Sequence, residues 1–189
     1  MPRTKTLPDD KVLELALAII HERGPEALTF DSLSRACGLS GATLVQRFGN
    51  KADLKQAALL RAWDGLDART TELDATMPAT PAGAIELLVA LSGSYGGIES
   101  YAEGLLVLRE DLRDPALRAR GAAWKATLSQ ALSRRLASLP GAPEGAGLMM
   151  ATQWQGALLW WGFDPAGKVE DHVCTTLTGF LAALVPDPG

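Results

Sequence analysis

The segment from Leu28 to Leu54, LTFDSLSRACGLSGATLVQRFGNKADL, constrains the fold of this chain more than any other part of the sequence. Thr29 stands where a helix N-cap belongs, and Gly38 can end the same helix in a left-handed conformation that costs other residues energy. Ser40 can cap a second helix directly after this turn. Two short helices joined in this way form a helix-turn-helix, whose second helix can enter the major groove of DNA.

The spacing of residues gives the second of these helices a packed side and an outward side. Leu44 and Phe48 lie four residues apart, so they share the face that packs on the first helix. The outward face then carries Gly41, Ala42, Val45 and Gln46. Small residues permit close approach to base edges, a Gln amide can pair with adenine, and Ala or Val can touch a thymine methyl group. The alternative is a solvated face of a helix with a purely structural role.

This run resembles the DNA-binding domain of the tetracycline-repressor (TetR) family. That family has a Thr that caps its second helix, a small residue followed by Gly in the turn, and a Lys that opens its fourth helix. Here these features are Thr29, Cys37-Gly38 and Lys51. The resemblance implies base contacts from the outward face and phosphate contacts from Thr29, Thr43, Arg47 and Lys51.

One position departs from the family pattern. The family usually has a Thr-Leu-Tyr run in its third helix, whose Tyr holds a DNA phosphate, whereas this chain has Thr43-Leu44 followed by Val45. The aromatic residue that the family shows nearby is matched by Phe48.

The distribution of charge favours DNA binding only weakly. The net charge of the whole chain is −4, which argues against a generic binder of polyanions. Residues 1–56 contain eight Lys or Arg and seven Asp or Glu, a net charge of +1, so the remaining residues carry −5. Phosphate therefore repels the N-terminal part less than the rest, and Arg3 and Lys5 form a small basic arm.

Helical periodicity recurs along nearly the whole chain, which predicts an all-α protein of about nine helices. We expect a helix-turn-helix domain over residues 1–56 and a helical ligand-binding and dimerisation domain over residues 57–189. A fourth helix capped by Asn50 is expected to run to about Thr76, long enough to connect the two domains.

Aromatic residues gather in the second part of the chain, which holds all five Trp. Ligand cavities are apolar with a few polar groups, so an apolar or aromatic small molecule is the expected ligand. Its expected contacts are Tyr95, Tyr101, Trp124 and Trp154. Each of these residues could instead belong to an ordinary core.

The last two predicted helices, 147–163 and 168–185, carry wide apolar stripes. The TetR family builds its dimer from its last two helices, so the resemblance implies a homodimer. The expected interface residues are Gln153, Gly156, Ala157, Trp160, Val173, Leu177, Phe180 and Leu184. The same stripes could complete the core of a monomer.

Few residues suit catalysis or metal binding. His172 and Cys174 lie two apart, so on a helix they point to different sides and cannot chelate one metal. No nucleotide-binding or nucleophile motif occurs, and we expect neither a cofactor nor a metal. No signal-peptide pattern or apolar run of membrane-spanning length is present, so we expect a cytoplasmic protein that does not enter the membrane.

Together these features predict a ligand-responsive transcriptional regulator, a repressor released from its operator DNA by a small apolar or aromatic effector. Two alternatives remain. The first is an all-helical small-molecule-binding protein that has lost DNA binding. The second is a helical enzyme, which would need a carboxylate cluster such as Glu99, Glu103 and Glu110 in a cavity.

Overall fold

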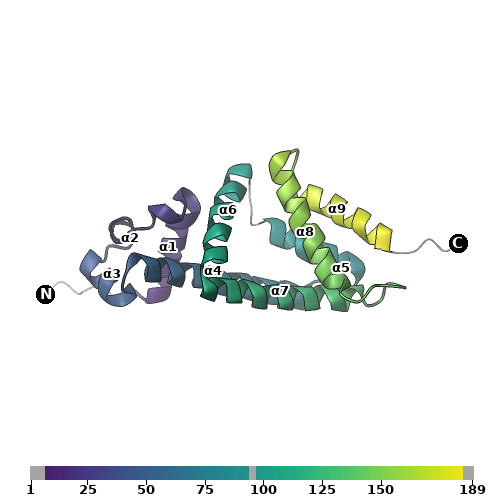
Figure 1. The fold of residues 1–189 in the computed structure, drawn as a ribbon, viewed down its shortest axis with the longest axis horizontal. Helices are drawn as coiled ribbons and strands as arrows, with labels where there is room; N and C mark the ends of the chain where they lie inside the picture. The colour runs from purple at the N-terminus through teal and green to yellow at the C-terminus, as the bar shows by residue number, and fades with distance from the viewer. Residues whose placement is uncertain (1–6, 94–96, 185–189) are drawn as a thin grey trace. The chain divides into compact units, whose positions relative to one another are not determined.

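The structure is a computed structural model, and it describes residues 7–93 and 97–184 (Figure 1). Within these ranges the chain forms nine α-helices and one short 3₁₀ helix, η1, as predicted for an all-α protein. Their bounds are α1 Asp9–Arg23, η1 Pro25–Ala27, α2 Phe30–Cys37, α3 Gly41–Phe48, α4 Lys51–Thr76, α5 Pro81–Ser92, α6 Ile98–Arg113, α7 Pro115–Leu136, α8 Ala146–Phe163 and α9 Val169–Leu184.

The chain divides into two compact units. The first contains Met1–Leu66 and Ala102–Gly121, and the second contains Asp67–Tyr101 and Ala122–Gly189. The sequence predicts a single boundary after residue 56, whereas this division falls inside α4 and places most of α6 in the first unit. Lys55 of α4 and Glu110 of α6 form an ion pair within the first unit, and such contacts between distant segments have no local signal in the sequence.

The first unit contains α1, α2 and α3, the first part of α4, most of α6 and the start of α7. Asp9 and Asp10 stand in the first turn of α1, where carboxylates interact favourably with the helix dipole. Ile20, Leu33 and Leu44 come from the first three helices and are fully buried in one core. This core fixes the orientation of α3 on α2.

In the second unit, α9 packs against both α5 and α8 (Figure 1). The fully buried side chains Leu87 and Leu88 of α5 and Val173 and Leu177 of α9 fill this core. Gly147 allows α8 to approach α7, because a Cβ at that position would overlap with the backbone carbonyl oxygen of Ser129.

The predicted helix ends agree closely with the structure. The fourth helix was expected from Asn50 to about Thr76, and α4 spans Lys51–Thr76. The Oδ1 atom of Asn50 accepts hydrogen bonds of 2.8 Å from the amide of Ala52 and 3.1 Å from that of Asp53, so Asn50 caps this helix. Among the described helices, none has both the length and the apolar character needed to cross a bilayer.

Candidate functional site

Short-range hydrogen bonds define the ends of α2. The hydroxyl of Thr29 accepts a 3.0 Å hydrogen bond from the amide of Ser32, and the amide of Thr29 donates a 2.9 Å bond to Oγ of Ser32. This reciprocal pair is a capping box, so Thr29 is the N-cap as predicted. At the other end, Gly38 has φ = 75°, the left-handed conformation expected of it.

Two further hydrogen bonds hold the turn between α2 and α3. Oγ of Ser34 donates a 2.6 Å hydrogen bond to the carbonyl oxygen of Leu39, and Oγ of Ser40 accepts a 3.1 Å bond from the amide of Thr43. Ser40 therefore caps α3, as the sequence predicts. These bonds hold the two helices in one geometry before any partner is present.

The outward face of α3 is accessible. Ala42, Val45 and Gln46 are exposed, with 48% of Val45 accessible, while Gly41 is partly buried. Leu44 on the opposite face is completely buried and Phe48 is partly buried. This face offers small and apolar groups with one amide.

The side chains expected to contact phosphate already have partners within the chain. The Thr43 hydroxyl lies 2.8 Å from that of Ser40, and the Thr29 hydroxyl caps α2. Nη1 of Arg47 donates to the carbonyl oxygen of Leu7 at 2.6 Å and to the carboxylate of Asp9 at 3.2 Å. Arg47 thereby ties α3 to the start of α1.

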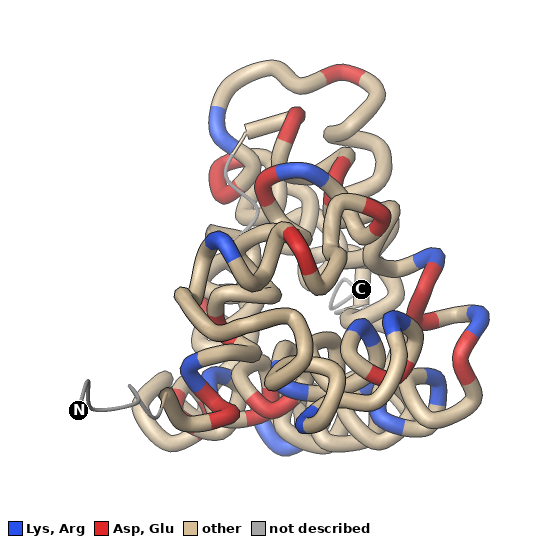
Figure 2. Tube along the Cα trace, turned by 90° about the vertical axis from the view of Figure 1, so that its left-hand side faces the viewer, with Lys and Arg blue, Asp and Glu red and all other residues tan. Residues whose placement is uncertain are grey.

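Lys51, the first residue of α4, is paired with a carboxylate from η1. Its Nζ lies 3.0 Å from Oε2 of Glu26 and 3.4 Å from the Glu26 carbonyl oxygen. The hydrogen bond and positive charge of Lys51 lower the pKa of the Glu26 carboxyl, with a smaller contribution from Lys55. Cationic and anionic residues are closely interspersed along the Cα trace (Figure 2).

Two hydrogen-bonded pairs of side chains, which the sequence does not predict, lie between α4 and the α6–α7 corner. Nε2 of Gln56 donates a 2.7 Å hydrogen bond to Asp114, which lowers the pKa of that carboxyl. Nε1 of Trp63 donates a 3.1 Å bond to Asp111, whose pKa is raised because burial disfavours its charged form. The partners lie about fifty residues apart in sequence, so no local pattern could have indicated them.

The expected ligand-binding aromatics form two pairs in the second unit. The rings of Trp124 and Trp154 are 6.3 Å apart, and Tyr101 meets Trp161 edge-to-face at 6.1 Å. Burial raises the pKa of the Tyr101 phenol. Trp161 is not among the ligand contacts that the sequence predicts, and Tyr95, which is, lies outside the described residues. Trp154 is buried and Trp124 partly buried, so both contribute to packing within the unit.

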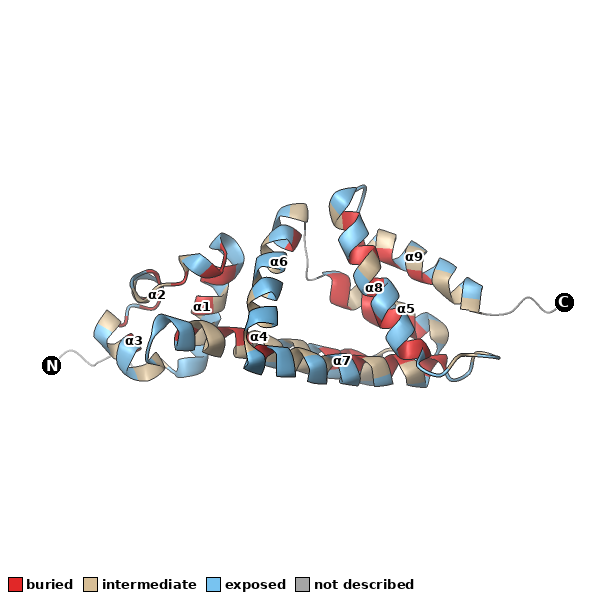
Figure 3. Ribbon diagram, in the orientation of Figure 1, coloured by how far each residue is buried: buried red, intermediate tan, exposed pale blue. Residues whose placement is uncertain are grey.

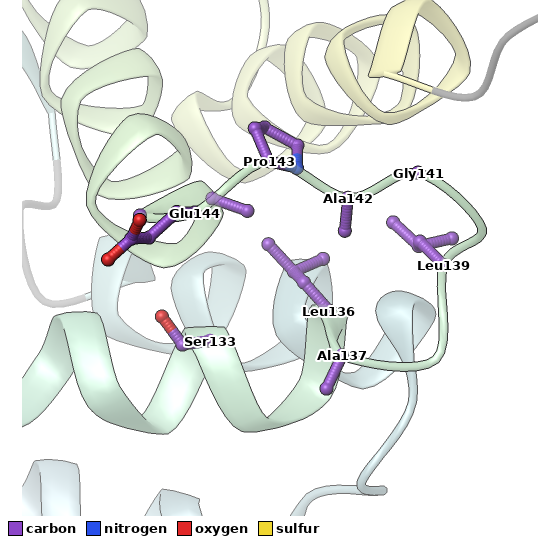
Figure 4. Close-up of a pocket in the computed structure, with 10 residues that line it drawn as sticks. Ser133, Leu136, Ala137, Leu139, Gly141, Ala142, Pro143 and Glu144 are labelled. Atoms are coloured by element: carbon purple, nitrogen blue, oxygen red, sulfur yellow. The ribbon is translucent and has the colours of Figure 1, made fainter.

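A surface pocket of about 330 Å³ lies elsewhere in the second unit, where α7 ends and α8 begins. Figure 4 shows the Leu136 and Pro143 side chains beside it, with the Ser133 hydroxyl and the Glu144 carboxylate on one side. Among the expected aromatic residues that the structure describes, none lines this pocket.

The expected dimer residues fall into two classes. On α8, Gln153 and Trp160 are exposed, and 68% of Trp160 is accessible. Partly exposed residues are Gly156 of α8 and Phe180 and Leu184 of α9. Figure 3 shows exposed and partly buried positions along both helices. In contrast, Ala157, Val173 and Leu177 are buried inside the second unit, where α9 packs against α5 and α8. These three side chains belong to the chain's own core.

Other apolar side chains on α8 extend its exposed face. Phe163 is 75% exposed, and its ring lies 5.8 Å from that of Trp160. Met149 and Leu159 are also exposed, and neither is among the interface residues that the sequence predicts. No cluster of three or more metal-ligating side chains occurs among the described residues.

The comparisons with known proteins agree with this geometry. Residues 12–58 match the family described as "Bacterial regulatory proteins, tetR family", and this match includes η1, α2, α3 and the start of α4. This stretch of the chain is therefore similar to the DNA-binding domain of the TetR family. The comparison with curated protein sequences gave no match.

Solved structures show the same TetR-like fold over almost the whole chain. A transcriptional regulator from Rhodococcus sp. Rha1 is 20% identical, with a TM-score of 0.73 and coverage of 95% of this chain and 100% of that one. A candidate regulator from Saccharomonospora viridis, solved with choline, is 20% identical, with a TM-score of 0.71 and coverage of 91% and 94%. The multidrug-binding protein EbrR, solved with malachite green, is 20% identical, with a TM-score of 0.66 and coverage of 96% and 99%.

Proposed function

We propose that this protein is a DNA-binding transcriptional regulator of the TetR family, a repressor that a small organic effector releases from its operator. The observation that carries the proposal is the accessible face of α3, presented by a helix-turn-helix whose caps and core are complete within the chain. A helix held in this way can enter the major groove without prior refolding.

Sequence would be read by the outward face of α3. The Gln46 amide can make two hydrogen bonds to adenine, and Ala42 and Val45 can contact thymine methyl groups. Gly41 permits close approach of the backbone. Phosphate contacts from Thr29, Thr43, Arg47 and Lys51 would set the position of the helix without reading sequence.

Two copies of the chain would supply two such helices. The surface that we propose for the dimer is the exposed face of α8, with Gln153, Gly156, Trp160 and Phe163, extended by Phe180 and Leu184 of α9. Exposed aromatic and apolar side chains of this size are typical of interface centres. Two-fold symmetry then predicts half-sites about 34–36 Å apart, or a multiple of that spacing.

The effector would bind in the second unit near Tyr101, Trp124 and Trp154. The bound choline and malachite green of the two structural neighbours make a small organic ligand reasonable for this fold. An effector that binds better to the conformation with low DNA affinity weakens operator binding, and operator DNA weakens effector binding by the same factor.

Sequencing the genomic fragments that the purified protein retains tests this function. The expected result is a small set of fragments that share a two-fold symmetric motif, which the protein protects from nuclease digestion. A protein that retains fragments without any common motif, or retains none at low salt, is not a sequence-specific regulator.

A further inference from the structure

The inference concerns Glu26, and it rests on the proposed DNA-binding function. Glu26 lies in η1, directly before α2, and Lys51 opens α4. The Nζ atom of Lys51 is 3.0 Å from one carboxylate oxygen of Glu26, while Lys55 lies 3.9 Å from the other. One carboxylate therefore stands between two lysines at the start of α4.

Both members of the Glu26–Lys51 pair are open to solvent. The Lys51 side chain is 44% exposed and that of Glu26 is 78% exposed. An ion pair of this kind contributes little to folding, with a typical value near zero to 1 kcal/mol. Stability of the fold is therefore a weak reason for an acidic residue at this position.

A phosphate that approaches Lys51 meets this carboxylate. The ammonium group must leave Glu26 or share its hydrogen bonds, and the carboxylate then stands close to the negative phosphate. Both effects oppose binding, because the ion pair is lost and two like charges are brought together. Lys55 cannot replace Lys51 without a similar loss, since it also pairs with Glu110.

We infer that Glu26 limits the affinity for DNA by competing with phosphate for Lys51. When DNA binds, a phosphate replaces the Glu26 carboxylate as the partner of Lys51 at the start of α4. This exchange lowers affinity for all sequences alike, because a phosphate contact carries no sequence information. The protein thereby binds non-operator DNA less tightly without any change in the face of α3 that reads bases.

Fluorescence anisotropy with a labelled duplex of about 30 base pairs of mixed sequence tests the inference, because phosphate contacts need no operator. Glu26→Gln is expected to bind this duplex about two- to five-fold more tightly than the unmodified protein, as expected for loss of an exposed ion pair. Glu22→Gln is the matched control, because Glu22 is exposed and has no ion-pair partner among the described residues. Glu22→Gln also removes one negative charge, so any increase in its DNA affinity measures the general effect of net charge.

A double-mutant cycle with Lys51→Met identifies the partner. The additional gain from Glu26→Gln over Glu22→Gln should disappear when Lys51 is absent. Circular dichroism should give all variants the same thermal midpoint, because the exchanged side chains are exposed. Equal gains from Glu26→Gln and Glu22→Gln overturn the inference, and weaker binding by Glu26→Gln means that Glu26 positions Lys51 for phosphate instead. If the unmodified protein does not bind the duplex at low salt, the proposed DNA-binding function itself is wrong.

Discussion

Trp154 Nε1 donates a 2.8 Å hydrogen bond to Oγ of Ser92, and both side chains are buried in the second unit. Oγ of Ser92 in turn donates a 2.8 Å bond to the carbonyl oxygen of Leu88. Trp154 of α8 is thus joined to the last turns of α5. A residue expected at a ligand site is therefore also a structural link between two helices.

Trp154→Ala should lower the free energy of unfolding by about 3–5 kcal/mol, because it removes a large buried side chain and leaves a cavity. Trp154→Phe should cost less, since most of the apolar volume remains and only the hydrogen bond to Ser92 is lost. Urea denaturation followed by circular dichroism measures both values. If Trp154→Ala is as stable as the unmodified protein, Trp154 does not support the core.

Arg135 should be essential for the stability of the second unit. It is buried, its Nη1 pairs with the Asp74 carboxylate, and its other nitrogens donate to the carbonyl oxygens of Asp74, Met77 and Pro78 at 2.9–3.2 Å. The guanidinium group therefore caps the end of α4.

Arg135→Ala should cost about 3–5 kcal/mol, because Asp74 and the three carbonyl groups lose a shared partner. Arg135→Lys should restore only a small part of the stability lost in Arg135→Ala, since a single ammonium group cannot span the same acceptors. Arg134, which also pairs with Asp74 but is exposed, offers the control, and Arg134→Ala should cost less than about 1 kcal/mol. Equal losses at the two positions would contradict the capping role of Arg135.

Asp111 should make stability depend on pH in the acid range. Burial raises the pKa of its carboxyl above the usual 3.8, so ionised Asp111 destabilises the folded state at neutral pH. This cost disappears as the pH falls through the raised pKa. Asp111→Asn keeps an acceptor for Trp63 and removes the partly buried charge, so it should raise stability at pH 7.

The difference in stability between Asp111→Asn and the unmodified protein should therefore shrink as the pH falls through the raised pKa of Asp111 toward the usual 3.8. Thermal melts across a pH series measure it. A variant that is less stable at neutral pH would show that the Asp111 charge is favourable where it lies.

Trp160→Asp should dissociate the proposed dimer and leave the chain folded. Trp160 is mostly exposed, so a carboxylate there remains in water in the monomer but would be buried and unpaired in the dimer. Light scattering should give the monomer mass, and far-ultraviolet circular dichroism should be unchanged. A Trp160→Asp variant that remains a dimer places the interface elsewhere.

Features set by neighbouring residues could be predicted from the sequence. Thr29 and Ser40 cap helices through bonds to residues three positions away, and Gly38 adopts the left-handed conformation that few other residues tolerate. The burial of Leu44 follows from the helical period alone. For this reason the helix-turn-helix was predicted nearly residue by residue.

Contacts between distant segments could not be predicted in this way. Glu26 pairs with Lys51, and Arg135 pairs with Asp74, across 25 and 61 residues. The apolar stripe of α9 also gave no indication of its partner, and Val173 and Leu177 are buried within their own chain. Because α8 is apolar around most of its circumference, its sequence did not distinguish buried Trp161 from exposed Phe163.

The central claim is that the outward face of α3 reads operator DNA. Its most direct test is the ratio of affinities for a genomically selected site and for a shuffled duplex of the same composition, measured with the unmodified protein and with Ala42→Asp. We expect the unmodified protein to prefer the selected site by about 10³-fold or more. Ala42→Asp, which places a charge on an exposed position of α3, should remain folded and bind both duplexes equally weakly. A folded Ala42→Asp variant with undiminished preference for the selected site would contradict the claim.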